Sequence, residues 1–218
     1  MEDKICYEHI NRYIRVVISR ETGFLKEMED YARSNYIPII QPETAALLKV
    51  LVKIHKPSRI LEAGTAIGYS SIIMARANSE AVIDTIEINE EYAKIAEKNI
   101  IGMGLGERVR IIVGDALEVM QCLSTPYDMI FLDAAKGQYV EYLPEVLRLL
   151  KPGGILISDN ILYKGLVAQP DPIPHKHRTI ANNLRKYLEL ICNDEQLETS
   201  VIPIGDGLAV SVKEGENK

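Results

Sequence analysis

The stretch FLDAAKGQY, residues 131–139, follows the largely apolar YDMI at 127–130. An apolar run of this length bounded by polar residues is typical of a buried strand, which we predict over 127–133. In parallel sheets, ligands bind beyond the carboxyl ends of the strands. Asp133 ends the predicted strand and Lys136 comes three residues later, so both are expected to face a polar crevice.

On both sides of this stretch, strand patterns alternate with helix patterns. Strands are predicted at 59–64, 82–87, 109–114, 127–133 and 155–160, and helices at about 69–77, 89–101, 138–150 and 177–192. The KPGG sequence at 151–154 is predicted to be the turn that ends the helix before it, and Gly205-Asp206-Gly207 to be the centre of a hairpin. This alternation predicts an α/β fold, with a mostly parallel sheet, helices on both faces and an antiparallel edge.

The segment before the first strand is predicted to be mainly helical. Residues 3–20 and 22–34 have the spacing of amphipathic helices, and 43–54 are a third helix. IPIIQPE at 37–43 is expected to be an extended connector, because proline disfavours helix in the residue before it. We expect a single domain over 1–218, with a helical extension at 1–36 and a catalytic core at 37–218.

The composition is that of an ordinary globular chain, with 47% apolar and 26% charged residues among 218. No apolar run approaches the ~18 residues that a membrane helix needs. The N-terminus is too charged for a signal peptide, so we expect a cytoplasmic protein. Cys6, Cys122 and Cys192 form no CxxC pair, which indicates reduced thiols and neither a disulfide framework nor a zinc site. The net charge of −6 argues against non-specific duplex binding, but residues 9–20 and 172–188 are locally basic.

The first three strand ends indicate a nucleotide-like ligand. Gly64 and Gly68 bracket a tight turn into a helix, without the G-x-G-x-x-G spacing of dinucleotide-binding folds. Glu87 ends the second strand and could accept hydrogen bonds from both ribose hydroxyls, or could lie at the start of the next helix. Asp115 after the third strand could bind an adenine amino group or cap the helix that follows. Together they indicate an adenosine-containing cofactor.

The fourth and fifth strand ends indicate a cation site. If these strands are neighbours, Asp133, Asp159 and Asn160 converge at one sheet edge. Carboxylate and amide oxygens suit Mg²⁺, Mn²⁺ or Ca²⁺ better than zinc, although both acids could simply cap the elements after them. Near a cation and inside a cleft, the charged form of Lys136 is disfavoured, so its neutral amine could act as a base.

The motifs ILEAGTAIGYSS, IEINEEYAKIAEKNI, GDA, YDMIFLDAAKGQY, LLKPGGILISDNIL and IGDGLAVSV resemble the cation-dependent O-methyltransferases of the catechol and caffeoyl-CoA type, over about residues 35–213. The resemblance implies a Rossmann-like, seven-stranded sheet in the order 3-2-1-4-5-7-6 and the cofactor S-adenosylmethionine (SAM). It implies that Asp133, Asp159 and Asn160 bind Mg²⁺ or a similar ion, that Lys136 is the base, that Asp206 closes the substrate side and that the protein is a homodimer. The residues implied around SAM are Glu62, Gly64, Ser70, Glu87, Asp115 and the backbone region of Asp133.

Within this family, NILYKGLVAQPD and the basic HKHRTIANNLRKYL resemble the bacterial branch that methylates 5-hydroxyuridine at the wobble position of tRNA. A tRNA anticodon loop is the partner that this implies. Its phosphates would meet the cationic side chains of Lys176, Arg178, Arg185 and Lys186, with Arg12 and Arg15 adding from the N-terminal helix. Small catechol-like or acyl-CoA phenolic substrates are the alternative. An NAD(P)-dependent reductase is disfavoured by the absent glycine fingerprint and the unexplained SDN, and a SAM-binding regulator without catalysis by the presence of Asp133 and Lys136.

Overall fold

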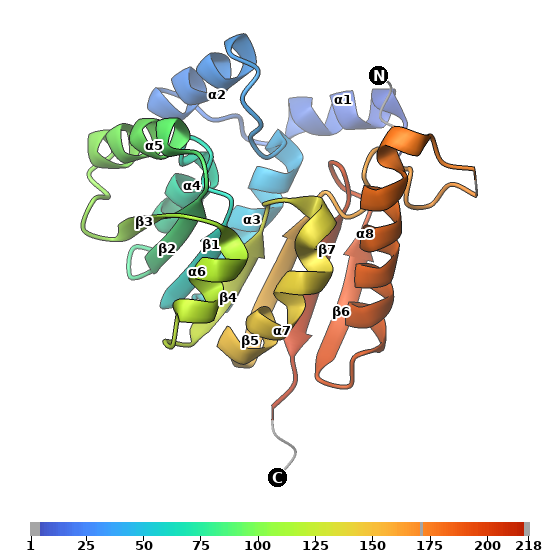
Figure 1. The fold of residues 1–218 in the computed structure, drawn as a ribbon. Helices are drawn as coiled ribbons and strands as arrows, with labels where there is room; N and C mark the ends of the chain where they lie inside the picture. The colour runs from blue at the N-terminus through green and yellow to red at the C-terminus, as the bar shows by residue number, and fades with distance from the viewer. Residues whose placement is uncertain (1–4, 171, 216–218) are drawn as a thin grey trace.

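The computed structural model describes residues 5–170 and 172–215, which form a twisted sheet between two layers of helices (Figure 1). The sheet has seven strands in the order β3-β2-β1-β4-β5-β7-β6, which confirms the predicted topology. β7 is antiparallel to both of its neighbours, β5 and β6, and the other neighbouring strands are parallel. The strands are β1 (Arg59–Ala63), β2 (Val82–Glu87), β3 (Val109–Val113), β4 (Tyr127–Leu132), β5 (Leu150–Asp159), β6 (Leu197–Ile202) and β7 (Leu208–Lys213).

Each face of the sheet has its own apolar core, because successive strand residues point to opposite faces. In β1, Ile60 belongs to one core and Leu61 to the other, and both are fully buried. The first core packs against α2 (Phe24–Ser34), α3 (Pro42–His55), α4 (Tyr69–Ala77) and α5 (Glu90–Gly102). The second core packs against α6 (Ala116–Cys122), α7 (Tyr139–Leu149) and α8 (His175–Asn193). Burial on both faces explains why the central strands are almost continuously apolar.

The remaining helical elements are α1 (Glu8–Val17) and the short 3-10 helix η1 (Lys136–Gln138), which begins four residues after Leu132, the last residue of β4. α1 lies above the carboxyl end of the sheet, on the same side as the first turn of α8 (Figure 1). The predicted helix at 3–20 is thus shorter than expected, and its first two residues lie outside the described part. Within residues 5–170 and 172–215, none of the helices combines the length and the apolar character that a bilayer crossing requires.

The KPGG turn was predicted wrongly, because residues 151–154 lie inside β5. Tyr127 of β4 pairs with Leu150, and Met129 pairs with Ile155, so the register shifts between these two pairs. Gly153 has a φ of 74°, which is the left-handed region that favours glycine. A side chain at Gly154 would lie 2.8 Å from the Lys151 carbonyl oxygen. The two glycines therefore let β5 bulge between Leu150 and Ile155 without ending the strand. A local turn motif does not distinguish such a bulge from a turn between two elements.

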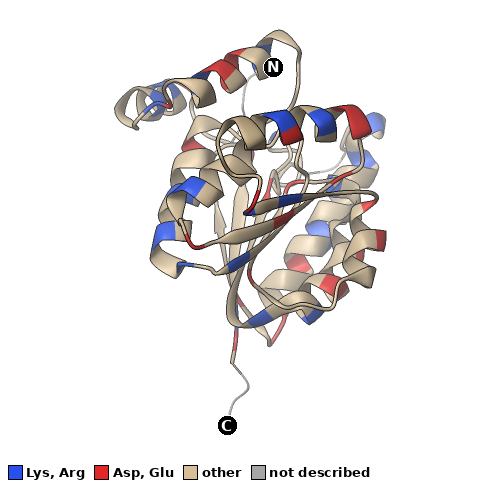
Figure 2. Ribbon diagram, turned by 90° about the vertical axis from the view of Figure 1, so that its left-hand side faces the viewer, with Lys and Arg blue, Asp and Glu red and all other residues tan. Residues whose placement is uncertain are grey.

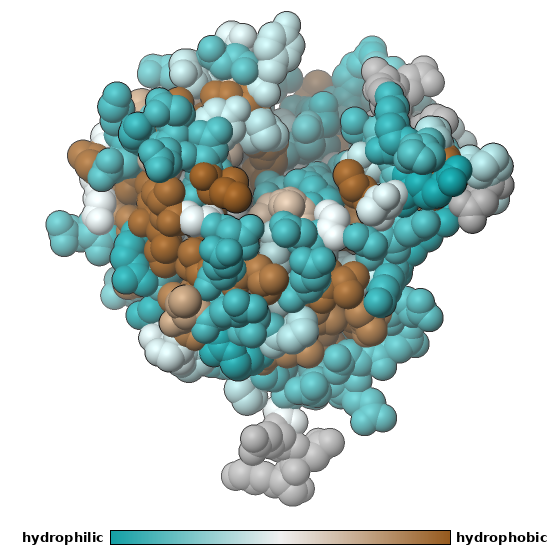
Figure 3. Space-filling model, in the orientation of Figure 1, coloured by the Kyte–Doolittle hydropathy of each residue, from teal (hydrophilic) through white to brown (hydrophobic). Residues whose placement is uncertain are grey.

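Basic and acidic residues are interspersed along the helices and also occur on strands and loops (Figure 2). Figure 3 shows a largely hydrophilic face on which apolar side chains gather over α5 and β3. Ile101 and Val113 belong to this apolar surface and are more than half exposed. Ile88, which is 69% exposed, follows β2 at the carboxyl end of the sheet, the end at which parallel α/β sheets bind their ligands.

Candidate active site

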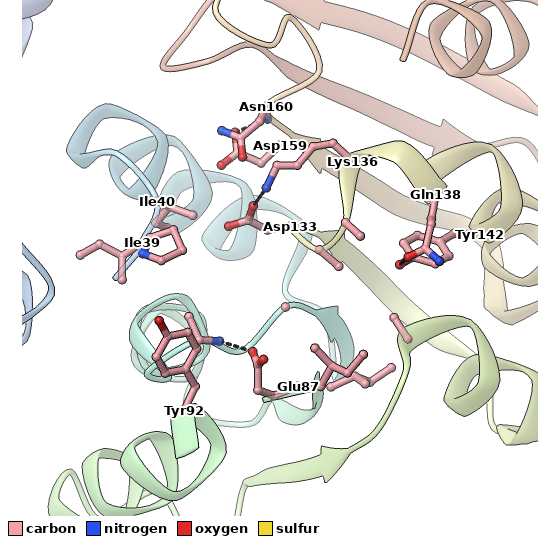
Figure 4. A pocket seen from close by; sticks show the side chains of 18 of the residues that line it. Ile39, Ile40, Glu87, Tyr92, Asp133, Lys136, Gln138, Tyr142, Asp159 and Asn160 are labelled. Carbon is pink, nitrogen blue, oxygen red and sulfur yellow. Dashed lines mark hydrogen bonds and ion pairs between the residues drawn. The ribbon is translucent and has the colours of Figure 1, made fainter. Parts of the chain in front are cut away.

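A crevice of about 450 Å³ opens at the carboxyl ends of the parallel strands (Figure 4). The connector at residues 38–41 forms one wall and the start of η1 forms another. Seven of the predicted site residues line this crevice: Gly64, Glu87, Asp115, Asp133, Lys136, Asp159 and Asn160. The sheet therefore brings together residues that are up to 96 positions apart in the sequence.

The glycine turn after β1 lies directly against the end of β4. Gly64 has a φ of 105°, and a Cβ at this position would overlap the backbone carbonyl of Asp133. The Asp133 amide in turn donates to the Ala63 carbonyl over 2.8 Å. Only glycine permits this backbone separation, so Gly64 allows the ends of β1 and β4 to lie this close together beside the crevice.

Glu87 closes the crevice at the end of β2. Its Oε2 accepts from the Ala66 amide at 2.8 Å and its Oε1 from the Asn89 amide at 2.9 Å, so the carboxylate is held by two backbone N–H groups. The side chain that caps α5 is Asn89, which accepts from the amides of Glu91 and Tyr92. Glu87 is thus oriented at the crevice wall, where free lone pairs of its carboxylate can meet ribose hydroxyls.

Asp115 caps the N-terminus of α6, which was one of the two roles predicted for it. Its Oδ1 accepts from the amides of Leu117 at 2.9 Å and Glu118 at 3.2 Å, at the start of α6. Because Asp115 also lines the crevice, the same residue shapes the wall beside Glu87. One of its carboxylate oxygens, Oδ1, is thus engaged at the start of the helix, as expected for a side chain at the N-cap.

Glu62 and Ser70 lie behind the crevice and are not among its lining residues. Glu62 is fully buried and accepts hydrogen bonds from three hydroxyl groups, those of Ser70 (2.5 Å), Ser71 and Thr85 (2.6 Å). Burial raises the pKa of Glu62 to about 7, although the hydroxyl donors lower it. The hydrogen bonds of Glu62 therefore hold the first turn of α4 against β1 and β2, next to the glycine turn.

Asp133, Asp159 and Asn160 point toward one another on one side of the crevice, with Lys136 beside them (Figure 4). Asp159 is 2% exposed, and its Oδ1 accepts from the Asn160 amide at 2.7 Å. Burial, and then the negative charge of Asp133, raise the pKa of Asp159 well above the ordinary value for aspartate. The hydroxyl of Tyr139 lies 2.9 Å from the Leu132 carbonyl and 3.1 Å from that of Asp159, which ties the ends of β4 and β5 together.

Two facing carboxylates with a neighbouring amide fit a hard divalent cation, which would offset their mutual repulsion. The set contains only two acids. Across the part of the chain that the structure describes, no three or more His, Cys, Asp or Glu side chains gather into a metal-binding group. A cation here would therefore depend on the Asn160 amide, on water and on oxygens of the substrate. The donor chemistry is compatible with Mg²⁺ or Mn²⁺ and not with the nitrogen and sulfur ligands that zinc prefers.

Lys136 reaches this set from η1. Its Nζ lies 2.9 Å from Asp133 Oδ1, and its side chain is 27% exposed. The Asn183 side chain of α8 donates to the Gly137 carbonyl at 2.7 Å, which fixes η1 against that helix. The predicted position in the crevice is therefore observed. For Lys136 to accept a proton, its ion pair with Asp133 has to be released first.

Several lining residues were not singled out in the sequence. The connector contributes Pro38, Ile39, Ile40 and Gln41, and η1 and α7 contribute Gln138 and Tyr142. The Tyr142 hydroxyl donates to Gln138 Oε1 at 2.8 Å and so orients the amide. The apolar pair at 39–40 inside a proline-bounded connector was a usable signal, because such residues seldom remain in a connector without packing against something.

The predicted RNA-contact residues occupy two regions and have different roles. Lys176, Arg178 and Lys186 are exposed on α8. Arg185 donates instead to the carbonyls of Val167 and Gln169, and so pins the loop before α8.

On α1, Arg12 forms an exposed pair with Glu8 at 2.5 Å. Arg15 binds both carboxylate oxygens of Glu43, at 2.8 and 2.7 Å, and also Gln41 Oε1 at 3.0 Å. Because Glu43 is 2% exposed, Arg15 anchors α1 to α3. Asp206, which was expected to close the substrate side, has its carboxylate on the Lys164 amide.

Comparison with known proteins assigns the chain to a family. A sequence model of the O-methyltransferase family matches residues 17–214. A catechol O-methyltransferase from Niastella koreensis is 34% identical over 168 residues, which cover 74% of this chain and 76% of that protein. A candidate caffeoyl-CoA O-methyltransferase from Staphylococcus aureus has a crystal structure that is 33% identical, with a TM-score of 0.87 over 94% of this chain and 100% of the other.

An O-methyltransferase from Bacillus cereus, solved in complex with SAH, is 28% identical, with a TM-score of 0.82 over 94% of this chain and 97% of that one. The family match includes the glycine turn, both acidic strand ends and the terminal hairpin, so it spans the whole crevice. The chain therefore belongs to the O-methyltransferase family, of the caffeoyl-CoA and catechol type.

Proposed function

We propose that this O-methyltransferase uses SAM and a divalent cation to methylate the 5-hydroxyl of 5-hydroxyuridine at the tRNA wobble position, giving 5-methoxyuridine. The observation that carries the proposal is the crevice, which joins a wall suited to a nucleoside with an oxygen-rich cluster. Glu87 lies in the first part, and Asp133, Asp159 and Asn160 form the second. The SAH complex of the Bacillus cereus relative supports SAM as the methyl donor.

The crevice residues divide the work of methyl transfer. Glu87 would accept hydrogen bonds from the ribose of SAM, and the turn at Gly64 would lie against its amino-acid portion. Asp133, Asp159 and Asn160 would hold the cation, which supplies Lewis-acid chemistry and favours the ionised form of the substrate hydroxyl. A bound SAM would supply the methyl group, which would pass to the substrate oxygen as the C–O bond forms and the C–S bond breaks, with S-adenosylhomocysteine as the leaving group. Orientation of the two reactants is expected to supply most of the rate enhancement.

Lys136 is the proposed acceptor of the hydroxyl proton. Its Nζ has a partner in Asp133, so a cation bound to Asp133 would compete with that ion pair and release the amine. The 5-hydroxyl and 4-carbonyl of 5-hydroxyuridine are neighbouring oxygens, as are the two hydroxyls of a catechol. Both substrates therefore fit the same oxygen-binding set, and the surface around the crevice has to distinguish them.

The surroundings of the crevice support an RNA substrate. A second hollow of about 740 Å³ shares Gln41 with the crevice and lies between the α1–α2 segment and α3. Its cationic lining residues outnumber its acidic ones, Glu21 and Glu29; they are Arg15, Arg20, Lys26, Arg33 and Lys49. Four of them form ion pairs, Arg15 with Glu43, Lys26 and Arg33 with Asp30, and Lys49 with Glu21, so RNA phosphates would have to compete with these acids. Exposed cations of α8 are a further set. An anticodon loop needs cations for its phosphates and a target base turned out of the stack.

The test is methylation of RNA that lacks 5-methoxyuridine. The protein is incubated with labelled SAM, Mg²⁺ and tRNA from a strain that cannot methylate 5-hydroxyuridine, and the nucleosides are identified by mass spectrometry. Parallel reactions contain a free catechol and a phenolic acyl-CoA. Label in 5-methoxyuridine supports the proposal. Turnover of a small phenol with none on the tRNA would instead favour the activity named for the Niastella koreensis relative.

Charge reversal shows whether the α8 cations serve RNA. Arg178→Glu with Lys186→Glu should weaken tRNA methylation strongly and leave methylation of a catechol nearly unchanged, since a catechol has no phosphate. Lys53→Glu with Lys98→Glu, at exposed lysines on α3 and α5, makes the same change in net charge away from α8 and is the matched control. Rising salt should suppress the RNA reaction selectively. Equal losses on both substrates would mean that these residues support the fold.

A further inference from the structure

The segment after β5 has an unusual backbone. Asn160, Tyr163 and Lys164 have φ values of 58°, 46° and 58°, in the left-handed region that costs a residue with a side chain about 1 kcal/mol or more. Asn160 is also one of the three proposed cation ligands. A ligand on such a segment keeps its orientation only when the surroundings hold the backbone in place.

The loop between β6 and β7 holds this segment by three hydrogen bonds. The Ile161 amide donates to the Gly207 carbonyl at 3.1 Å, and the Leu162 amide donates to the Asp206 carbonyl at 3.1 Å. The Lys164 amide donates to Asp206 Oδ1. Asp206 therefore binds the segment through both its backbone and its side chain, from a loop more than 40 positions later in the sequence.

Packing enforces the same contact. Gly207 has a φ of 87°, and a Cβ added there would overlap the side chain of Leu162. The loop and the segment are therefore too close for any larger residue at this position. Leu208 continues this pairing into the sheet, because it is the register partner of Asp159. The contact is thus continuous with the strand pair that carries the second cation ligand.

Asp206 is half-buried, and it does not line the crevice. Its effect on a cation would therefore pass through the segment it holds or through its charge, and not through direct contact.

We propose that Asp206 is a positioning residue. Its carboxylate fixes the backbone N–H of Lys164 and thereby keeps the side-chain amide of Asn160 directed at the cation site. This inference rests on the proposed role of Asp133, Asp159 and Asn160 as cation ligands. Asp206→Ala removes the acceptor and frees the left-handed segment. Loss of groups that orient metal ligands typically weakens metal binding by about 10–100-fold.

The experiment measures Mn²⁺ binding to the whole protein by electron paramagnetic resonance, without substrate. Asp206→Ala should bind Mn²⁺ about 10–100-fold more weakly than the unmodified protein. Asp206→Asn keeps an oxygen acceptor for the Lys164 amide and should restore most of the affinity. SAM affinity, measured by calorimetry in EDTA, should change in neither variant. Asp194→Ala is the matched control, since Asp194 accepts from the Gln196 amide in another turn at 2.8 Å.

The outcomes separate this inference from the proposed function. Unchanged Mn²⁺ affinity in Asp206→Ala would overturn the positioning role, as would an Asp206→Asn variant as weak as Asp206→Ala, which would assign the effect to charge. If Asp206→Ala does not fold, Gly207→Ala disturbs the same contact from the adjacent residue and should also weaken Mn²⁺ binding. Unchanged affinity in Asp133→Ala would instead refute the cation site itself, whatever Asp206 does.

Discussion

Replacing Glu62 by glutamine should remove a pH-dependent contribution to the stability of the fold. Burial removes water from this carboxyl and raises its pKa from 4.5 to about 7. The hydroxyls of Ser70, Ser71 and Thr85 stabilise the charged form and offset only part of this rise. The unfolded chain ionises the same carboxyl near its ordinary value. Between these two values the folded state binds the proton more tightly than the unfolded state.

The stability that protonated Glu62 contributes is fully present below the pKa of this carboxyl in the unfolded chain. It is lost as the pH rises through about 7, the pKa in the folded protein. The size is on the order of 2–3 kcal/mol between pH 5 and pH 8, at ~1.36 kcal/mol for each unit of pKa difference. Glutamine is neutral at every pH, and its amide can still exchange hydrogen bonds with the three hydroxyls, so Glu62→Gln should lack this contribution.

Urea unfolding at pH 5 and pH 8 measures the effect. The difference in unfolding free energy between Glu62→Gln and the unmodified protein should change by about 2–3 kcal/mol between the two pH values, in favour of the variant at pH 8. Glu97→Gln makes the same chemical change on the exposed side of α5 and should give a difference that does not depend on pH. A constant difference for Glu62→Gln as well would refute the argument from burial.

Four further perturbations test the crevice and the N-terminal helix. Asp133→Ala should abolish methyl transfer while thermal melts show an intact fold. EDTA should abolish the activity of the unmodified protein in the same way, and added Mg²⁺ should restore it, whereas full activity after exhaustive chelation would exclude a cation. Lys136→Ala should lower turnover ~10²–10⁴-fold at neutral pH with little effect on substrate affinity, and unchanged turnover would exclude a base. Gly64→Ala should weaken SAM binding in calorimetry, because its Cβ overlaps the Asp133 carbonyl; normal affinity would mean that the turn can yield. Tyr13→Asp, on the exposed apolar face of α1, should convert the predicted homodimer to a monomer in light scattering, unless the interface lies elsewhere.

The sequence by itself determined where most strands lie and which residues follow them, and the family resemblance implied their order. The strand positions depend on local signals: apolar runs, glycine turns and an acid directly after a strand. Gly64, Glu87, Asp133 and Asp159 all line the crevice as predicted, because they follow or end parallel strands, whose carboxyl ends lie at the same edge of the sheet.

Only the tertiary structure decided what the side chains behind those positions do. Glu62 is two residues before Gly64, yet it faces away from the crevice, since the parallel register of β1 and β2 places Thr85 beside it. Arg185 was expected to meet phosphates and instead holds the carbonyls of the preceding loop. Asp206 binds an amide 42 residues earlier. Each of these contacts joins segments that are distant in the chain, so its existence depends on how whole elements pack, and no local pattern of residues encodes it.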